Sequence, residues 1–417
     1  SKSIIVPELF KGAKIKVSMP EARVSCNWCN SVNWRKVGIR RLVGRQKQIY
    51  FCKACKRKFS GNVLLNQEEQ IIASSERKTY SQNWPAYNSA QTQEKLMFLQ
   101  ILDEIVSKFQ NQEIKVGRPK AELSDILFSC CLKVYTGFSG RRLNSELEIA
   151  QSQGYLKEVP HFNTVLNSFN QKELSPALQQ ILRLASFPLK EVESNFSVDS
   201  TGFSTSLFSR WVDKRFGKDK TERIWVKCHA MVGTKTNVIS SIEVTEGHVA
   251  DSPYFIPLVD STAKDFKIKE VSADKAYSSR ANLEAVVNHG GIPYVPFKNN
   301  TTGKALGSKV WSTMHRYFFA HQEEFYQRYH RRSNIEATFS MLKRKFGNNL
   351  RTKTFTGQTN EILCKAVCHN IVVLIHEINE LGVRPELLWG KNEIFNIARN
   401  IIDTQKPLNV QNDLVHK

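Results

Sequence analysis

The sequence predicts a multidomain α/β protein: a mixed five-stranded sheet with helices, a small cysteine-bearing unit and an α-helical region. The chain has 417 residues and is 41% hydrophobic, which suffices for a full core and for two or three domains. Two Cys-x2-Cys pairs mark a small unit within residues 22–60. Apolar residues then recur at three- and four-residue steps, and alternating runs typical of strands begin near residue 195.

Net charge narrows the choice of partner. Sixty Lys and Arg against thirty-nine Asp and Glu leave +21, which favours nucleic acid or an anionic membrane. No apolar run approaches the roughly 20 residues of a membrane span, and Ile371–Ile375 is among the longest. Double-stranded DNA is therefore the expected partner, and no membrane is expected. The first residues lack the apolar core of a signal peptide, so we expect a cytoplasmic protein.

The unit at 22–60 carries the pattern of a zinc ribbon. Cys26 and Cys29 form one pair, and Cys52 and Cys55 form the second. Two such pairs predict one structural Zn²⁺ held by four thiolates. The unit is too small to fold alone without such a cross-link. The alternative is four free buried thiols. Ten Lys and Arg between residues 35 and 58 make DNA contact a natural second role.

The remainder of the chain divides by composition. Residues 61–92 are polar with little periodicity and predict a linker. Residues 93–190 predict a helical region that binds DNA ends, with Ile101, Ile105 and Phe109 on one helix face. Arg141 and Arg142 are its candidate phosphate contacts. Residues 195–385 form the expected catalytic domain, and residues 386–417 a C-terminal tail.

The order of the predicted strands and helices within residues 195–385 indicates how the sheet is connected. Three consecutive strands are expected in SVDSTGF, IWVKCHAMVG and NVISSIEVTEG. A helix, the strand IKEVSADKAY, a second helix and the strand IPYVPF follow, and a long helix near 322–346 completes the series. The order β-β-β-α-β-α-β-α, with antiparallel strands first and crossovers after, is that of an RNase H-like domain.

Three carboxylates are the candidate catalytic residues. Asp199 and Asp274 lie in predicted strands, and Glu336 is the single acid between Arg328 and Lys353, among eight Lys and Arg. Such cations make sense if they face a polyanion. Carboxylates suit hard divalent ions, so we expect two Mg²⁺ (or Mn²⁺) ions that activate the attacking oxygen and stabilise the leaving one. The alternative is three ordinary solvated acids.

Helical spacing supports the functional interpretation of the basic segment. At 100° per residue, one narrow stripe contains Tyr329, Arg332, Glu336 and Lys343. A second stripe, suited to packing on the sheet, contains Ile335, Phe339, Leu342 and Phe346. Nothing in folding requires the polar stripe.

These motifs resemble those of the DDE transposases of bacterial and archaeal insertion sequences. The spacing Tyr329-x2-Arg332-x3-Glu336-x6-Lys343 is similar to the signature around the third acid in one large branch. VDSTGF at 198–203 and SADKAYSS at 272–279 resemble the first and second acid motifs, and GRP, KVYTGFSGRR and LCKAVCHN add to the likeness. The interval between Asp274 and Glu336 leaves no room for the large insertion domain of some relatives.

The resemblance implies metal-dependent cleavage at transposon ends, followed by attack of a 3′-OH on target DNA. It further implies phosphate contacts at Arg332 and Lys343, DNA positioning by Tyr329, a homodimer when two ends are synapsed, and a location at the nucleoid. Two alternatives stay open: a structure-selective nuclease with the same core, and a catalytically silent DNA-binding protein derived from a transposase.

The remaining His and Cys residues are expected to be structural. His229 and His248 flank the third predicted strand and suit a polar core or turn role better than Mg²⁺ binding. Cys364, Cys368 and His369 resemble a metal trio but lie on an apolar helix. Core packing is the preferred interpretation there, as for Cys130, Cys131 and Cys228.

Overall fold

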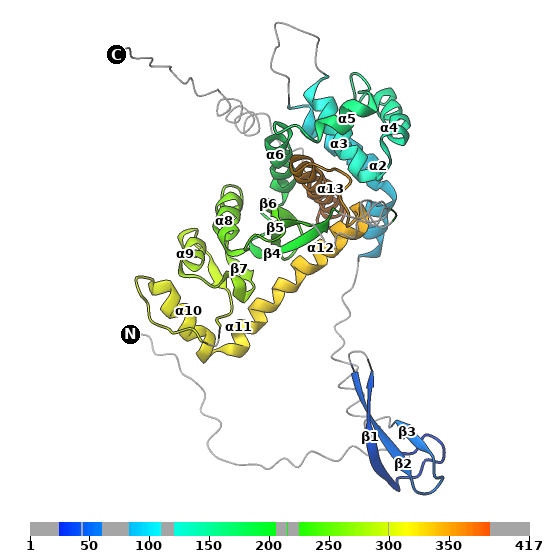
Figure 1. The fold of residues 1–417 in the computed structure, drawn as a ribbon, viewed down its shortest axis with the longest axis vertical. Helices are drawn as coiled ribbons and strands as arrows, with labels where there is room; N and C mark the ends of the chain where they lie inside the picture. Colours follow the sequence, from blue (N-terminus) through cyan, green and yellow to red (C-terminus); the bar gives the residue numbers. More distant parts are fainter. Residues whose placement is uncertain are drawn as a thin grey trace. The chain divides into compact units, whose positions relative to one another are not determined.

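The computed structural model describes residues 25–42, 45–60, 83–109, 121–205, 215, 225–298 and 300–383. The chain forms two compact units, Ser1–Gln82 and Asn83–Lys417 (Figure 1). Most of the predicted linker and all of the predicted tail lie outside the described residues. Within the described part, no helix is both long enough and apolar enough to cross a membrane.

The first unit contains a three-stranded antiparallel sheet in the order β1-β2-β3. Its strands are β1 (Trp34–Leu42), β2 (Arg45–Cys52) and β3 (Lys58–Ser60). The buried core is limited to Cys26, Cys52 and Phe59, against which Trp34 and Tyr50 pack. So small a core needs an additional cross-link, as expected for a metal-stapled unit.

The second unit is built on a five-stranded mixed sheet in the order β6-β5-β4-β7-β8, as the RNase H-like prediction requires. The strands are β4 (Asn195–Ser204), β5 (Trp225–Gly233), β6 (Ile239–Glu246), β7 (Glu270–Ala273) and β8 (Ile292–Tyr294). The first three strands pair antiparallel, and β4, β7 and β8 pair parallel. The antiparallel-then-parallel prediction is confirmed.

Strand alternation gives the sheet two buried faces. On one face, Phe203 and Cys228 join a core built with the helices of 84–186 and 333–381. On the other, Val198 and Met231 join a core that includes α8 (Phe255–Ala263) and α9 (Arg280–Asn288). Figure 1 shows these two helices on one side of the strands, with α6 and α13 on the other. Helices therefore cover both faces, as crossover connections require.

The helical region begins earlier than the sequence predicted. Helix α2 starts at Trp84 because Asn83 caps it and Pro85 occupies its first turn, where proline is tolerated. Residues 84–92 are thus helix and not linker. The helices are α2 (Trp84–Val106), α3 (Leu123–Thr136), α4 (Gly140–Ser152), α5 (Phe162–Ser168) and α6 (Leu174–Ser186). They share a core with the sheet and belong to the same compact unit as the predicted catalytic region.

The long helix expected near 322–346 is interrupted. It comprises α11 (Gln322–Tyr329), a 3₁₀ turn (His330–Arg332) and α12 (Ser333–Phe346). Helix α10 (Lys309–Ala320), which the sequence analysis missed, precedes it, and α13 (Phe355–Leu381) follows. The 3₁₀ turn winds more tightly than an α-helix, so the angles calculated across Tyr329–Glu336 do not hold.

Candidate active site

Parallel pairing of β4 with β7 brings the first two acids to adjacent strands. Val198 and Ala273 are the last paired residues, and Asp199 and Asp274 follow them directly. Asp199 remains within β4, where its Oδ1 accepts a hydrogen bond from the Ser200 amide at 2.9 Å. Asp274 directly follows β7 and caps the 3₁₀ turn Lys275–Tyr277, where it accepts a hydrogen bond from the Lys275 amide at 2.6 Å. Both acids therefore lie beside one another on adjacent strands.

The third acid comes from the first turn of α12. The predicted packing stripe holds this helix in place, since Ile335, Phe339 and Leu342 are buried in the core shared with β4 and β5. Glu336 lies beside that stripe, and its side chain is 63% exposed. An exposed carboxylate next to a tightly packed helix face is accessible to a ligand.

Arg332 connects the first and third acids. Its Nη2 donates to Asp199 Oδ2 at 3.0 Å, and its Nη1 donates to Glu336 Oε1 at 3.1 Å. The prediction that this residue contacts phosphate did not anticipate these ion pairs. Among the described residues, no hydrogen-bond acceptor contacts its buried Nε. A cation held between two candidate metal ligands occupies the position that their charges favour.

Electrostatics link all three acids. Burial raises the pKa of Asp199, the Ser200 amide and Arg332 lower it, and the charges of Asp274 and Glu336 raise it. Neighbouring carboxylates destabilise one another's charged form, and a nearby cation offsets that repulsion. The site therefore favours a bound positive charge.

Tyr329 and Lys343, the other two members of the predicted stripe, also lie near the acids. Burial raises the pKa of Tyr329, and the charges of Asp274 and Asp199 raise it further, against the opposing effect of Arg332. Lys343 Nζ donates to Thr201 Oγ1 at 2.6 Å and lies 5.3 Å from the centre of the Phe203 ring. Thr201 and Phe203 share the Asp199 face of β4, so Lys343 flanks the acids along that strand.

Several cations of the basic segment have acidic partners that the sequence did not reveal. Arg328 and Arg331 contact Glu270 of β7 at 2.8 and 2.9 Å, and Lys345 contacts Glu94 of α2 at 2.5 Å. These three cations therefore have partners within the protein, and contact of the basic segment with a polyanion stays a prediction. Only tertiary structure brings residues so distant in sequence together.

Arg141 and Arg142 are not part of this site. Both are exposed at the start of α4, and Figure 1 shows α4 well separated from β4 and β7. Their proposed role as phosphate contacts is independent of the acids.

A polar cluster on the opposite face of the sheet supports β4. His229 pairs in register with Ser200 and is fully buried, as expected for a core histidine. Its Nδ1 lies 3.3 Å from Asp251 Oδ1, and Lys227 lies 3.1 Å from the same oxygen. Burial lowers the pKa of His229 to about 4. His248, by contrast, is exposed in a turn.

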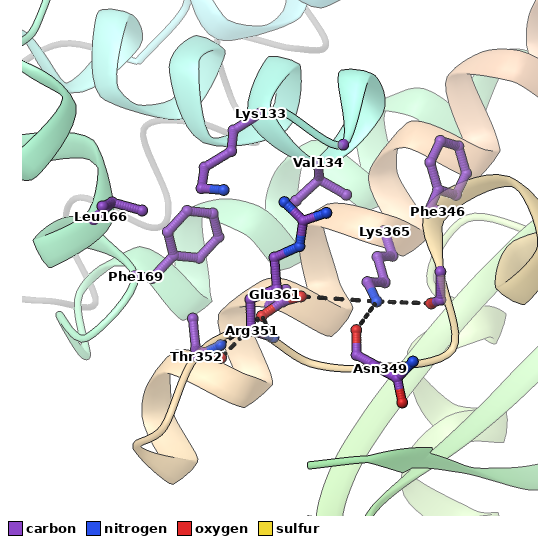
Figure 2. A pocket seen from close by; sticks show the side chains of 12 residues that line it. Lys133, Val134, Leu166, Phe169, Phe346, Asn349, Arg351, Thr352, Glu361 and Lys365 are labelled. Atoms are coloured by element: carbon purple, nitrogen blue, oxygen red, sulfur yellow. Dashed lines mark hydrogen bonds and ion pairs between the residues drawn. The ribbon is translucent and has the colours of Figure 1, made fainter. Parts of the chain in front are cut away.

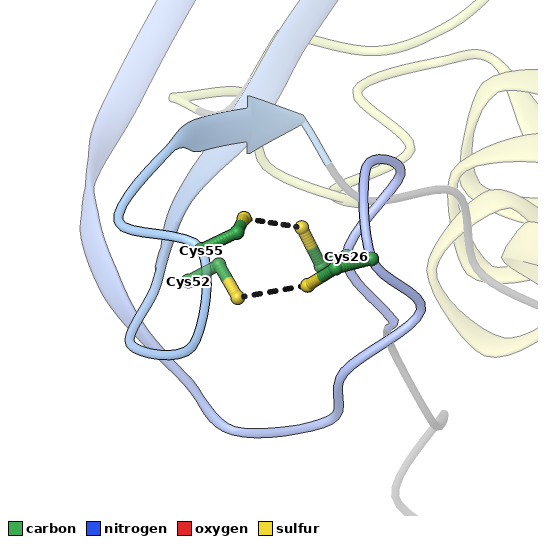
Figure 3. Close-up of side chains that lie close together, drawn as sticks. Cys26, Cys52 and Cys55 are labelled. Atoms are coloured by element: carbon green, nitrogen blue, oxygen red, sulfur yellow. Dashed lines mark hydrogen bonds between the residues drawn. The ribbon is translucent and has the colours of Figure 1, made fainter.

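The four predicted zinc ligands converge in the first unit (Figure 3). The Sγ atoms of Cys26 and Cys55 are 3.5 Å apart, and those of Cys29 and Cys52 are 3.6 Å apart. All four sulfurs lie within 4.8 Å of one another. Tetrahedral zinc with Zn–S bonds of about 2.3 Å separates its sulfurs by about 3.8 Å, so the cluster fits that ion.

The two cysteine pairs form matching turns. Cys26 N donates to Ser31 O and Cys52 N donates to Arg57 O, both at 2.9 Å. Asn30 and Lys56, each directly after the second cysteine of its pair, have positive φ. The Cys55 amide lowers the pKa of Cys52 to about 6, which favours the thiolate that binds metal.

The other cysteines are structural, as predicted. Cys130, Cys131, Cys228, Cys364 and Cys368 are all buried. His369 does not join a metal trio, because its Nε2 lies 2.9 Å from the Asn237 carbonyl. Among the described residues, the four-cysteine cluster is the group of three or more ligands gathered closely enough to hold an ion.

The three acids offer the oxygen donors that Mg²⁺ and Mn²⁺ prefer. They are not gathered as closely as the cysteines, since Arg332 lies between Asp199 and Glu336. Their charge and the raised pKa of Asp199 nevertheless fit a divalent cation.

Comparison with known families agrees with this geometry. Residues 191–371 match the family model described as "Transposase DDE domain". This stretch of the chain is similar to transposase DDE domains. Its limits enclose β4, β7 and α12, and with them all three candidate acids. The sequence prediction of DDE transposase function is confirmed at this level, without the finer assignment to a branch of insertion sequences.

Among solved structures, the chain is similar to one entitled "Cryo-EM structure of piggyBac transposase synaptic complex with hairpin DNA (SNHP)". The identity is 10%, the match covers 76% of this chain and 86% of that chain, and the TM-score is 0.35. At that TM-score the likeness adds nothing to the assignment of the DDE domain.

Proposed function

We propose that this protein is a DNA transposase that cleaves transposon ends and joins the freed 3′-OH to target DNA. The observation that carries this proposal is the placement of Asp199 and Asp274 on adjacent parallel strands, with Glu336 linked to Asp199 through Arg332. The transposase DDE domain matched by residues 191–371 encloses this arrangement.

Asp199, Asp274 and Glu336 would hold two Mg²⁺ or Mn²⁺ ions, with Arg332 moving from the acids to the DNA. Such ions supply charge stabilisation for the attacking and leaving oxygens of an in-line displacement at phosphorus. Arg332 then has donors for a phosphate, including the buried Nε without an acceptor. Tyr329 and Lys343 flank the acids and would position the strand.

The four-cysteine cluster would hold one structural Zn²⁺, because its sulfur spacing fits the tetrahedral ion. Residues 22–60 would then form a zinc ribbon that contacts DNA through its Lys and Arg. Arg141 and Arg142 would contact DNA at a separate surface on α4. A homodimer would synapse the two transposon ends, and the protein would act at the nucleoid in the cytoplasm.

The test is an assay with purified protein, Mg²⁺ or Mn²⁺, supercoiled target DNA and labelled duplexes from the DNA that flanks its coding sequence. Target-joined strands are expected from the wild type, and their absence with Glu336→Gln assigns the chemistry to this site. Cleavage without joining would instead identify a structure-selective nuclease. Binding with neither reaction would identify a DNA-binding derivative of a transposase.

A further inference from the structure

A cavity of about 220 Å³ lies away from the three acids, between the helical region and α13. Its lining comes from α3, α5, the connection 347–352 after α12, and α13 (Figure 2). Three cations line it: Lys133, Arg351 and Lys365. The site described above uses none of them.

Two of these cations share one acceptor, and the third is held by carbonyls of the connection after α12. Lys133 Nζ and Arg351 Nη1 both donate to the Phe138 carbonyl, at 3.3 and 3.1 Å. Lys365 Nζ donates to the carbonyls of Gly347 and Asn349, at 2.8 and 3.0 Å. In Figure 2 the nitrogens of Lys133 and Arg351 point toward one another, while the Lys365 ammonium points toward Asn349.

Two of the three cations are buried, whereas Arg351 is exposed. Lys133 is 9% exposed and Lys365 is 1% exposed. Burial lowers the pKa of both lysines, for Lys365 to about 8, and the Arg351 charge contributes in the same direction. Like charges in a desolvated place repel one another unless an anion lies between them.

The single acid in the lining, Glu361, pairs with Lys365 and offsets only part of the charge of the three cations. Its Oε2 accepts from the Arg351 amide, the Thr352 amide and the Thr352 hydroxyl, at 2.9 to 3.0 Å. Its Oε1 lies 3.7 Å from Lys365 Nζ. Three positive charges therefore face one negative charge, and that carboxylate is largely occupied with the chain after α12.

The size and walls of the cavity limit its ligand. Pockets for drug-sized ligands are typically about 300–1,000 Å³, so this smaller space suits a single phosphate group and part of its attached sugar. Val134, Leu166, Phe169 and Phe346 supply an apolar wall beside the cations. A phosphodiester combines a charged phosphate with the apolar edge of deoxyribose and matches both features.

The chain connects this cavity directly to the candidate active site. Ser204, at the end of β4, donates from its amide to Asn348 O at 3.2 Å and accepts from the Leu350 amide at 2.9 Å. The cavity-lining connection is thus fixed to the strand that carries Asp199. We infer that the cavity binds a backbone phosphate of the DNA held at the candidate active site, an inference that rests on the proposed function.

Lys133→Met tests the inference because it removes one charge and keeps the length of the side chain. Labelled duplexes from the flanking DNA would carry uncharged methylphosphonates, one position at a time. If one DNA phosphate occupies the cavity, a methylphosphonate at that position should weaken DNA binding by the wild type about tenfold. The same substitution should leave DNA binding by Lys133→Met unchanged. The variant should also reduce the slope of log affinity against log salt by about one.

Lys157→Met is the matched control. Lys157 is an exposed lysine that pairs with Glu122 and does not line the cavity, so its methylphosphonate profile should equal that of the wild type. If Lys133→Met fails to fold, Arg351→Gln replaces it with the same expectation. Identical profiles for the wild type and the folded cavity variant would overturn the inference.

Two further measurements distinguish free phosphate from DNA phosphate as the ligand, and distinguish failure of the cavity inference from failure of the transposase proposal. In one outcome, inorganic phosphate stabilises the wild type against unfolding but not Lys133→Met, while the methylphosphonate profiles of the two proteins are identical. That result would identify a site for a free anion and overturn the assignment to DNA. Formation of target-joined strands with identical profiles would reject the cavity alone. A selective loss at one phosphate without any joining would support the cavity and reject the transposase.

Discussion

Arg332 and Asp199, which are 133 positions apart in sequence, form an ion pair with an N–O distance of 3.0 Å. Both side chains are about four-fifths buried, at 18% and 20% exposure. The same guanidinium also donates to Glu336, so one cation joins two of the three candidate acids. Under the proposed function, a divalent ion or a DNA phosphate at this site would have to compete with this pair.

We predict that Arg332 and Asp199 are energetically coupled. A double-mutant cycle with Arg332→Gln and Asp199→Asn should give a coupling free energy of about 1–2 kcal/mol, measured by urea unfolding without divalent metal. The value lies below that of a deeply buried pair because both groups retain solvent contact. Arg331→Gln, which alters an exposed pair with Glu270, should show no coupling to Asp199→Asn. Additive effects of the Arg332 and Asp199 changes would contradict the prediction.

His369 should make stability depend on pH. Burial lowers the pKa of this histidine from 6.5 to about 4, with an opposing effect of the Asn237 carbonyl and a smaller lowering by Lys345. Between these values the unfolded chain binds a proton that the folded chain does not, so stability falls as pH drops below 6.5. Between pH 7 and pH 5, this group should remove about 2 kcal/mol from the unfolding free energy.

Comparison with His369→Gln isolates that contribution from those of other titrating groups. The wild type should lose about 2 kcal/mol more than the variant over this interval, measured by urea unfolding at each pH. Equal losses in the two proteins would show that His369 is not held neutral by the fold.

The cysteine cluster should bind one zinc ion per chain. Purified protein should contain close to one equivalent by elemental analysis, and Cys52→Ser should contain close to none. Removal of the ion should unfold the first unit and change the fluorescence of Trp34, because Cys26, Cys52 and Phe59 alone form too small a core. Cys130→Ala, which changes a buried cysteine of the second unit, should keep the ion. An intact first unit without metal would contradict the assignment.

The sequence predicted the elements and chemistry that depend on local pattern. Strand alternation located β4 and β5, and helical spacing identified Ile335, Phe339 and Leu342 as the face of α12 that packs on the sheet. The spacing of the cysteine pairs predicted a cluster that the structure forms. Each of these signals lies within a short stretch of chain.

Other features depend on contacts between distant residues and could not be predicted in this way. The pairs of Arg328 with Glu270 and of Lys345 with Glu94 link positions far apart in sequence. The 3₁₀ turn at His330–Arg332 interrupts the expected long helix, and the pair of Arg332 with Asp199 joins residues far apart in sequence. The cavity beside Lys133 likewise forms only when α3, α5 and α13 pack together.

The most direct test of the account compares strand joining by single variants of the three acids. Asp199→Asn, Asp274→Asn and Glu336→Gln preserve side-chain size and remove the charge that would hold a divalent ion. Each should abolish target-joined product with Mg²⁺ and with Mn²⁺, whereas Glu270→Gln, at a nearby acid paired with two arginines, should retain it. Joining at the wild-type level by any one of the three acid variants would contradict the central claim.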